Sequence, residues 1–157
     1  MATTTDEPVL ERELVLTRRF SAPRELVFRA WTDPEHLMRW WGPKVFTTPE
    51  CTIDPRPGGE LLIVMQDSVG QRYPMTGRVE SIDPPRAFSF SFTASHPATG
   101  PALEGVTAIT LTEQNGQTEL VVTTRARGLI PQAAMMLAGM ETGWSQSLER
   151  LAAQFGA

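Results

Sequence analysis

The stretch PQAAMMLAGMETGWSQSLERLAAQF, residues 131–155, decides the fold. Its apolar residues recur at steps of three and four, which is the repeat of one helical face. They are Ala133, Met136, Met140, Trp144, Leu148, Leu151 and Phe155. The sequence therefore predicts one long amphipathic helix over residues 131–155. Methionine adapts to irregular spaces, so we interpret this helix as the lid of a sheet-lined cavity, although ordinary core packing is the more common role of any single residue in the stripe.

Gly143 lies inside this predicted helix. A glycine in a helix interior costs about 1 kcal/mol relative to alanine. We therefore expect the helix backbone to approach another element closely at this residue.

The chain before this helix is expected to be mostly strand. AFSFSFT, residues 87–93, alternates Phe88, Phe90 and Phe92 on one face with serines on the other, as a half-buried strand does. Further strands are predicted at residues 13–20, 45–53, 60–66, 71–82, 105–113 and 118–126. The segment 95–103 is expected to be a loop, and the Asn-Gly of residues 114–117 to form a hairpin turn. Two short helices are expected after the first strand, where Pro23 and Asp33-Pro34 provide start signals.

Short turns between consecutive strands require a mostly antiparallel sheet. One face of such a sheet can cover the terminal helix while the other faces water. We therefore predict an α+β domain over residues 11–157, preceded by a frayed tail over residues 1–10. Pro49 divides its strand and indicates an edge or a bulge. Pro49 and Pro74 are interpreted as blunting edge strands, which favours a monomer over an oligomer.

Composition excludes several classes of function. The net charge of −4 argues against a nucleic-acid surface, because phosphate binding requires a basic patch. No apolar run reaches the ~20 residues of a membrane span. The N-terminal segment lacks the features of a signal peptide. Cys51 is the only cysteine, so a reducing compartment is expected, and with it a cytoplasmic location.

Several stretches of the chain resemble a known family. They are RRFSAPRELVFRAWTDPEHLMRWWGP (18–43), DPRPGG (54–59), GRVESIDPPRAFSF (77–90), VTAITLTEQNGQTELVVTT (106–124) and GWSQSLERLAAQF (143–155). In this order they are similar to the AHSA1 family, related to the C-terminal domain of the activator of Hsp90 ATPase, within the SRPBCC (START-like, helix-grip) superfamily. The resemblance covers roughly residues 11–155.

The resemblance implies a helix-grip fold, in which a curved antiparallel sheet of about six to seven strands wraps around the C-terminal helix and leaves a cavity between them. Members and relatives of the family bind small molecules or lipids, act as polyketide aromatase/cyclases, or serve as Hsp90 co-chaperones. Function must still be argued from the site, because one fold hosts many activities.

Aromatic and methionine side chains typically line small-ligand pockets. The candidate ligand-binding residues are Trp40, Trp41, Met65, Tyr73, Met75, Phe88, Phe90, Met136, Met140 and Trp144. Each one alone is more often plain core. Trp31, Trp40 and Trp41 form either a gate of the cavity or a plug at the open end of the sheet.

Residues that could carry catalysis are few. Cys51 is expected to be a buried, inert thiol, and His36 and His96 are expected at the surface, so we predict no metal site and no cofactor. Tyr73, Glu60, Arg78 and Glu104 are the candidates for a buried acid/base set. Tyr73 and Arg78 differ in parity along one strand and should therefore point to opposite faces.

We rank three hypotheses. The first is a cavity that binds a small hydrophobic or amphipathic ligand, such as a lipid, an aromatic or a polyketide-like compound. The second is an Hsp90-type co-chaperone, which is weakened because only about ten residues precede the first predicted strand. The third is an aromatase/cyclase-like enzyme, for which a titratable pair in the cavity would be needed. A non-enzymatic role is favoured.

Overall fold

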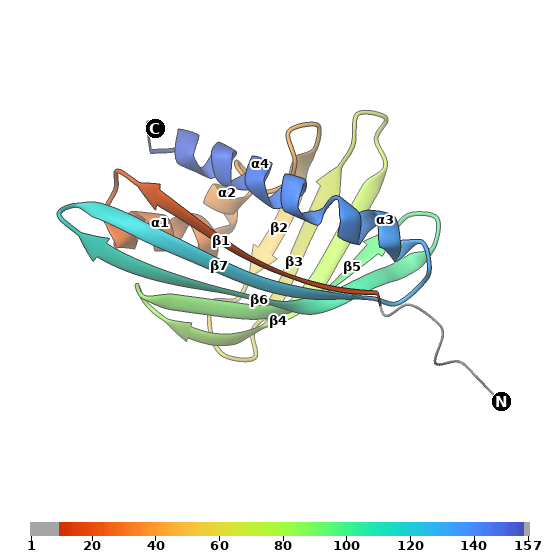
Figure 1. Cartoon of the computed structure of the whole chain (residues 1–157), viewed down its shortest axis with the longest axis horizontal. Helices are drawn as coiled ribbons and strands as arrows, with labels where there is room; N and C mark the ends of the chain where they lie inside the picture. Colours follow the sequence, from red (N-terminus) through yellow and green to blue (C-terminus); the bar gives the residue numbers. More distant parts are fainter. Residues whose placement is uncertain (1–9, 156–157) are drawn as a thin grey trace.

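The computed structural model describes residues 10–155. Helices and strands follow one another in the predicted order, with one strand and two short helices first, the other strands in the middle and a helical segment at the end (Figure 1). They are β1 (Glu11–Phe20), α1 (Arg24–Thr32), α2 (Pro34–Leu37), β2 (Thr47–Ile53), β3 (Glu60–Gln66), β4 (Arg72–Asp83), β5 (Ala87–His96), β6 (Gly100–Gln114), β7 (Gln117–Gly128), α3 (Ala133–Ala138) and α4 (Met140–Ala153).

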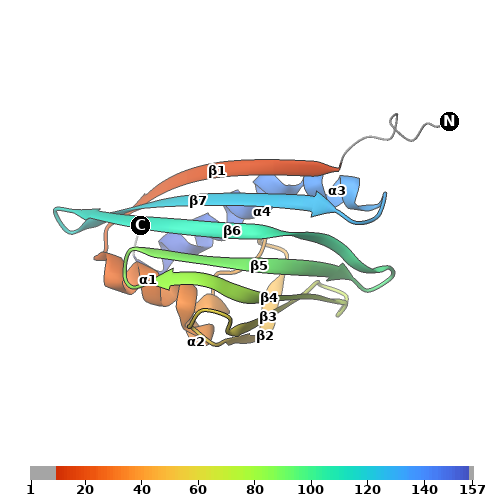
Figure 2. The ribbon, with the colours of Figure 1, turned by 90° about the horizontal axis from the view of Figure 1, so that it is seen from below.

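All seven strands form one antiparallel sheet in the order β1-β7-β6-β5-β4-β3-β2. The sheet is curved, and α4 crosses its concave side, while the view from below shows the other side of the sheet free of helices (Figures 1 and 2). The α+β helix-grip prediction is therefore confirmed.

Alternation along the strands follows this layering. In β5, Phe88 and Phe90 are buried in the core, whereas the Ser89 hydroxyl lies on the outer face and shares a 2.6 Å hydrogen bond with Ser81 of β4. The predicted hairpin turn is also confirmed, since Gln114 pairs with Gln117 in the sheet. The two residues between them, Asn115 and Gly116, adopt φ angles of 55° and 77°, which glycine and asparagine tolerate best.

Pro49 and Pro74 were both predicted to lie in edge strands, but only Pro49 does so. Pro49 lies in β2, an edge strand whose pairing with β3 shifts register between Thr47 and Glu50, as expected of a bulge. Pro74, in contrast, lies in β4, which is inside the sheet. Its assignment to an edge strand was wrong. Pro74 is tolerated there because pairing between β4 and β5 begins only at Met75.

The prediction of a loop over residues 95–103 was also wrong, because most of this segment is strand. β5 continues to His96 and β6 begins at Gly100, so only a short turn separates them. A register shift between Ala94 and Ser95 accommodates the irregular sequence. The segment forms strand rather than loop because a bulge allows a Pro/Gly-rich stretch to stay paired with its neighbour at the end of a sheet.

The C-terminal segment is not one helix but two, which corrects the sequence prediction. α3 ends at Ala138 and α4 begins at Met140, with the break at Gly139. Arg12 of β1 stabilises the break, since its Nη1 donates to the carbonyls of Leu137 and Ala138 at 2.8 and 3.2 Å. Glycine has a low helix propensity, and the arginine supplies donors to carbonyls at the end of α3.

Candidate ligand-binding cavity

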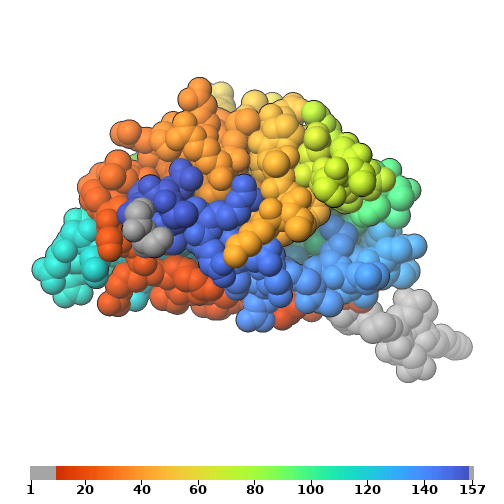
Figure 3. Space-filling model, turned by 90° about the horizontal axis from the view of Figure 1, so that it is seen from above, coloured from red at the N-terminus to blue at the C-terminus, as the bar shows by residue number. Residues whose placement is uncertain are grey.

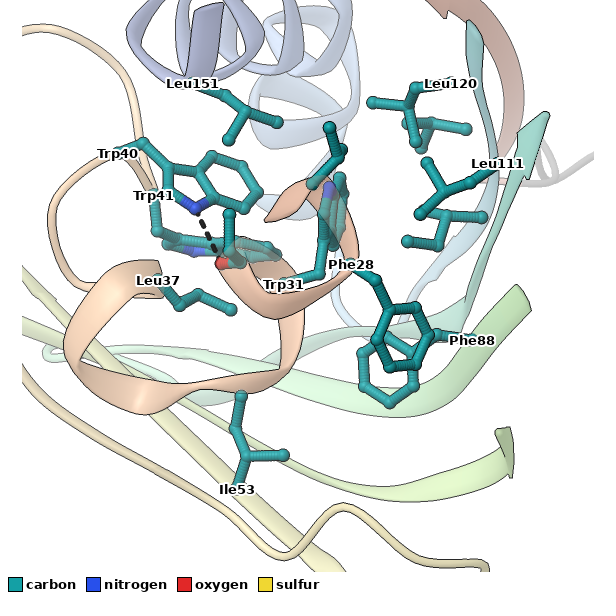
Figure 4. Close-up of a cluster of buried hydrophobic side chains, with 14 of the residues drawn as sticks. Phe28, Trp31, Leu37, Trp40, Trp41, Ile53, Phe88, Leu111, Leu120 and Leu151 are labelled. Atoms are coloured by element: carbon teal, nitrogen blue, oxygen red, sulfur yellow. Dashed lines mark hydrogen bonds between the residues drawn. The ribbon is translucent and has the colours of Figure 1, made fainter. Parts of the chain in front are cut away.

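The core beside the short helices is built from tryptophan. Trp31 and Trp40 are completely buried, with ring centroids 4.7 Å apart in an edge-to-face arrangement. Trp40 donates its indole N–H to the carbonyl of Ala30 at 2.9 Å, the dashed line in Figure 4. Trp41 is 8% exposed and packs against Trp31 and Phe90. These tryptophans were interpreted either as a gate of the cavity or as a plug at the open end of the sheet. The complete burial of Trp31 and Trp40 fits the plug.

Next to this cluster, a cavity of about 230 Å³ lies between the inner face of the sheet and the helices α3 and α4. Its walls come from the loop after α2, from β3 to β7 and from one side of both helices. The lining residues are Trp41, Gly42, Pro43, Met65, Met75, Phe90, Phe92, Ala94, Leu103, Thr107, Ala126, Met136, Gly139, Met140, Gly143, Trp144 and Ser147.

Most of the predicted ligand-binding residues lie together in this wall. They are Trp41, Met65, Met75, Phe90, Met136, Met140 and Trp144. The strand and helix periodicities therefore brought side chains from the loop, the sheet and both C-terminal helices to one place. Contact of these side chains with a ligand stays a prediction.

Trp40, Phe88 and Tyr73 lie outside the lining. Trp40 belongs to the buried tryptophan core described above, and Phe88 packs its ring against Phe28 of α1 at 6.4 Å. Both face the filled end of the space under α4, where α1 and α2 occupy the concave side of the sheet.

Tyr73 is engaged elsewhere, at the end of the sheet. Its hydroxyl donates to the Asp67 carboxylate at 2.9 Å, and this hydrogen bond raises the pKa of Tyr73. Its ring makes edge-to-face contacts with Phe46 and His96, each with centroids 5.4 Å apart. The phenol is therefore a neutral structural group rather than part of the cavity wall.

The sequence pattern missed many lining residues, most of them small. Among these, Ala94, Ala126, Gly139 and Gly143 contribute to the space by having little or no side chain. No apolar periodicity signals an absent side chain, so such residues could not be found from sequence. Phe92 could have been found, because it shares the inner face of β5 with Phe90 in the alternating run.

The loop between α2 and β2, which closes one side of the cavity, is attached to α4 by side chains. Arg150 donates from one nitrogen, Nη1, to four backbone carbonyls of this loop at 3.0–3.3 Å. The acceptors belong to Trp41, Gly42, Pro43 and Phe46. Figure 3 shows the orange atoms of this part of the chain against the blue atoms of α4. Arg150 thus positions the part of the wall that carries Trp41.

Ser147, one turn earlier in α4, holds the same loop. Its hydroxyl accepts a hydrogen bond from the Gly42 N–H at 3.0 Å and donates to the carbonyl of Gly143 at 3.0 Å. Both functions of this hydroxyl are therefore used inside the protein.

Gly143 does not meet the expectation of a close backbone approach. A Cβ at this position would lie 3.5 Å from Cγ of Pro43, which is ordinary van der Waals contact. The expectation was wrong because Pro43 leaves room for a methyl group, and Gly143 instead lines the cavity.

We therefore expect Gly143→Ala to raise the free energy of unfolding by about 1 kcal/mol, since alanine removes the entropic cost of glycine in a helix. Urea denaturation followed by circular dichroism measures this change. A loss of stability would show that Pro43 and α4 pack more tightly than this contact distance allows.

The cavity wall is mostly apolar. No ionisable side chain lines it, and the lining side chains that carry a hydroxyl group are Thr107 and Ser147. It therefore lacks the titratable pair that an aromatase/cyclase-like reaction requires. Within residues 10–155 no group of three or more His, Cys, Asp and Glu residues is arranged to hold a metal ion.

With this geometry established, comparisons with known proteins place the chain. The sequence model of a family described as activator of Hsp90 ATPase homolog 1-like protein, AHSA1, matches residues 21–156. The chain belongs to the AHSA1 family. A comparison with curated proteins finds no match. The name of the family describes an activator of the Hsp90 ATPase, and it assigns no ligand to this chain.

Solved structures of bacterial proteins share this AHSA1 fold. An AHSA1 protein from Silicibacter pomeroyi is 28% identical, with a TM-score of 0.76, and the match covers 92% of this chain and 98% of that one. A protein from Chromobacterium violaceum is 26% identical, with a TM-score of 0.78 and the same coverages. One from Nitrosomonas europaea is 28% identical, with a TM-score of 0.71, covering 89% of this chain and 91% of that one.

The acid/base set proposed from the sequence is not present as a buried set in this AHSA1 structure. Glu60, Arg78 and Glu104 lie around a shallow groove on the outer face of the sheet, away from α4, and Tyr73 is not among them. Arg78 donates to the Gly58 carbonyl at 3.1 Å, and the Glu104 carboxylate accepts from Arg127 at 2.9 Å. Alternation along β4 placed Tyr73 and Arg78 on opposite faces, as the parity of the two residues indicated.

Cys51 is buried in β2, and burial raises the pKa of its thiol to about 12, with a smaller contribution from the Asp33 carboxylate.

We expect the native protein to resist thiol-modifying reagents at pH 8, where almost no thiolate exists, and to react once unfolded. Because the folded pKa is raised above the ordinary value of 9.0, this group leaves stability unchanged below pH 9 and lowers it as the pH rises from 9 toward 12. Rapid modification of folded protein by Ellman's reagent would contradict this prediction.

Among the described residues, none of the helices has the length and apolar character needed to span a bilayer.

Proposed function

We propose that this AHSA1 protein binds a small hydrophobic or amphipathic molecule in the cavity under α3 and α4. The observation that carries the proposal is an apolar space of about 230 Å³ whose wall contains thioethers and indole rings from distant parts of the chain. An engineered apolar cavity of about 150 Å³ holds benzene. The size therefore favours a compact ligand of one or two rings over a phospholipid or an extended polyketide.

The methionines and aromatic rings of the wall suit such a ligand. Met65 and Met75 extend from adjacent strands, and Met136 and Met140 from the two C-terminal helices. Thioether sulfur makes favourable contacts with the edges of aromatic rings, and methionine adapts its shape to the guest. Trp41 and Trp144 meet edge to face at 5.4 Å and provide rigid apolar surface.

Methyl NMR of protein labelled at methionine tests this proposal directly. Titration with neutral monocyclic and bicyclic aromatics should shift the methyl signals of Met65, Met75, Met136 and Met140. Met135, whose residue is 83% exposed, and Met38, which packs in the core away from the cavity, should stay unchanged. Shifts confined to Met135, or none across a broad set of compounds, would refute cavity binding.

Adjacent methionines of α3 supply matched variants. Met136→Ala removes a side chain from the cavity wall, whereas Met135→Ala removes an exposed one. We expect Met136→Ala to change the affinity for an aromatic ligand by at least about fivefold, since roughly 1 kcal/mol of contact is altered. Met135→Ala should leave it within twofold. Equal effects of the two substitutions in calorimetric titrations would place binding outside the cavity.

An Hsp90-type partner is the alternative, and the family description favours it. Stimulation of a purified Hsp90 ATPase by this protein, retained in a Met136→Ala variant, would support a protein-interaction role that is independent of the cavity. We also propose a cytoplasmic location from the single cysteine, and this location is compatible with both ligand binding and an Hsp90-type partner.

A further inference from the structure

Two threonines form an isolated polar pair on the inner face of the sheet. Thr107 of β6 and Thr124 of β7 are register partners, each 1% exposed, and their hydroxyl oxygens lie 2.8 Å apart. The two hydroxyl groups carry two hydrogens, and one of these forms the shared hydrogen bond. Within residues 10–155 neither hydroxyl has a further hydrogen-bond partner, from a side chain or from the backbone. One buried O–H group of the pair is therefore left without an acceptor.

Thr107 belongs to the cavity wall, whereas Thr124 does not. The other hydroxyl of the wall, that of Ser147, already donates to one backbone group and accepts from another. Thr107 thus offers the lining hydroxyl with spare hydrogen-bonding capacity. When Thr124 donates to Thr107, Thr107 can donate to a guest. When Thr107 donates to Thr124, the Thr107 oxygen can accept from a guest.

We infer that Thr107 determines the specificity of the cavity by hydrogen bonding to a single uncharged polar group, a hydroxyl or a carbonyl, on a compact aromatic ligand. This inference depends on the proposed function. A carboxylate or an ammonium group is excluded from the buried part of the ligand, because no ionisable side chain lines the cavity and an unpaired buried charge is strongly unfavourable.

Calorimetric titration with 4-ethylphenol and 4-ethyltoluene tests the inference. The two compounds have nearly the same shape, and only the first carries a hydroxyl group. Threonine and valine are also close in shape, so Thr107→Val removes the hydroxyl and little else. We expect this variant to reduce the preference for the phenol, expressed as the ratio of the two dissociation constants, by about tenfold relative to the wild type, as for one lost hydrogen bond. Its affinity for 4-ethyltoluene should stay within about twofold.

Thr124→Val is the matched control. It removes the internal partner and leaves the Thr107 hydroxyl free, so the preference for the phenol should be kept or increased. The double variant, Thr107→Val with Thr124→Val, leaves no hydroxyl unpaired and should fold even if Thr107→Val alone does not. It should show the same loss of preference as Thr107→Val.

The outcomes separate the two claims. If both compounds bind but their ratio is the same in wild type, Thr107→Val and the double variant, the inference is overturned and the proposed function stands. If neither compound binds the wild type and no methionine methyl signal shifts, both are overturned. Binding of 4-ethylbenzoate as tightly as 4-ethylphenol would also overturn the inference, because it would require a charge partner that the wall lacks.

Discussion

Replacing Arg150 with methionine is expected to lower the free energy of unfolding by about 3 kcal/mol, which is the size of losing a charged donor to more than one buried acceptor. Nη1 of Arg150 reaches four carbonyls of the loop after α2, and Nη2 reaches the carbonyl of Arg39 at 3.4 Å. Nη1 carries only two hydrogens, so these bonds are shared. Methionine retains the length of the side chain but provides no donor. The carbonyls of Gly42 and Phe46 would then lose their donor, whereas the Trp41 carbonyl keeps Thr48 Oγ1 and the Pro43 carbonyl keeps the Phe46 N–H.

Denaturant unfolding measures this effect, and a neighbouring cation supplies the control. Lys44, in the same loop, pairs with Glu149 of α4 at 2.9 Å, but both side chains are about 60% exposed. Lys44→Met should therefore cost less than about 1 kcal/mol, as is usual for a surface ion pair. Similar losses for the two variants would mean that Arg150 contributes only surface charge. We also expect Arg150→Met to lower the affinity for aromatic ligands, because Trp41 and Pro43 of the cavity wall lose the hydrogen bonds from Arg150.

Trp40→Ala is expected to destabilise the protein by about 4 kcal/mol, because it removes a completely buried indole from the core. Trp40→Phe separates the hydrogen bond from the volume. It retains much of the ring but leaves the carbonyl of Ala30 without its donor, at a cost of about 2 kcal/mol.

The same two variants test the placement of Trp40 outside the cavity. The affinity of folded Trp40→Phe for 4-ethyltoluene should equal that of the wild type, since only Trp41 of this pair lines the cavity. A loss of more than about fivefold in calorimetric titration would show that Trp40 contacts the ligand after all.

Periodicity predicted the layers of this AHSA1 domain well, since alternation requires a buried face and Phe88 and Phe90 are indeed in the core. It could not distinguish a residue that fills the core from one that borders a void. Phe88 and Phe90 lie on the same face of one strand, yet only Phe90 lines the cavity. The difference is set by what covers each from above, α1 for Phe88 and the C-terminal helices for Phe90, and this depends on tertiary packing.

Two further features were beyond local pattern. The break at Gly139 depends on Arg12, which lies in the first strand, and no periodicity within residues 131–155 indicates that partner. The predicted hairpin already pairs Thr107 with Thr124, but it does not indicate that Thr107 borders a void, which depends on residues such as Ala94 and Gly139 in other elements. The break and the void both arise from contacts between segments that are distant in sequence.

The pairing of β1 with β7 has a consequence for synthesis of the protein. Glu11 pairs with Arg127 and Phe20 with Thr118, so the strand of this sheet that is synthesised first is matched to the one that is synthesised last. Contacts of such long range form slowly, since a large loop of chain must close before they stabilise anything. Until β7 has emerged, Leu14 and Leu16 of the nascent polypeptide stay uncovered, and the newborn chain passes through a stage in which its first strand can associate with other proteins.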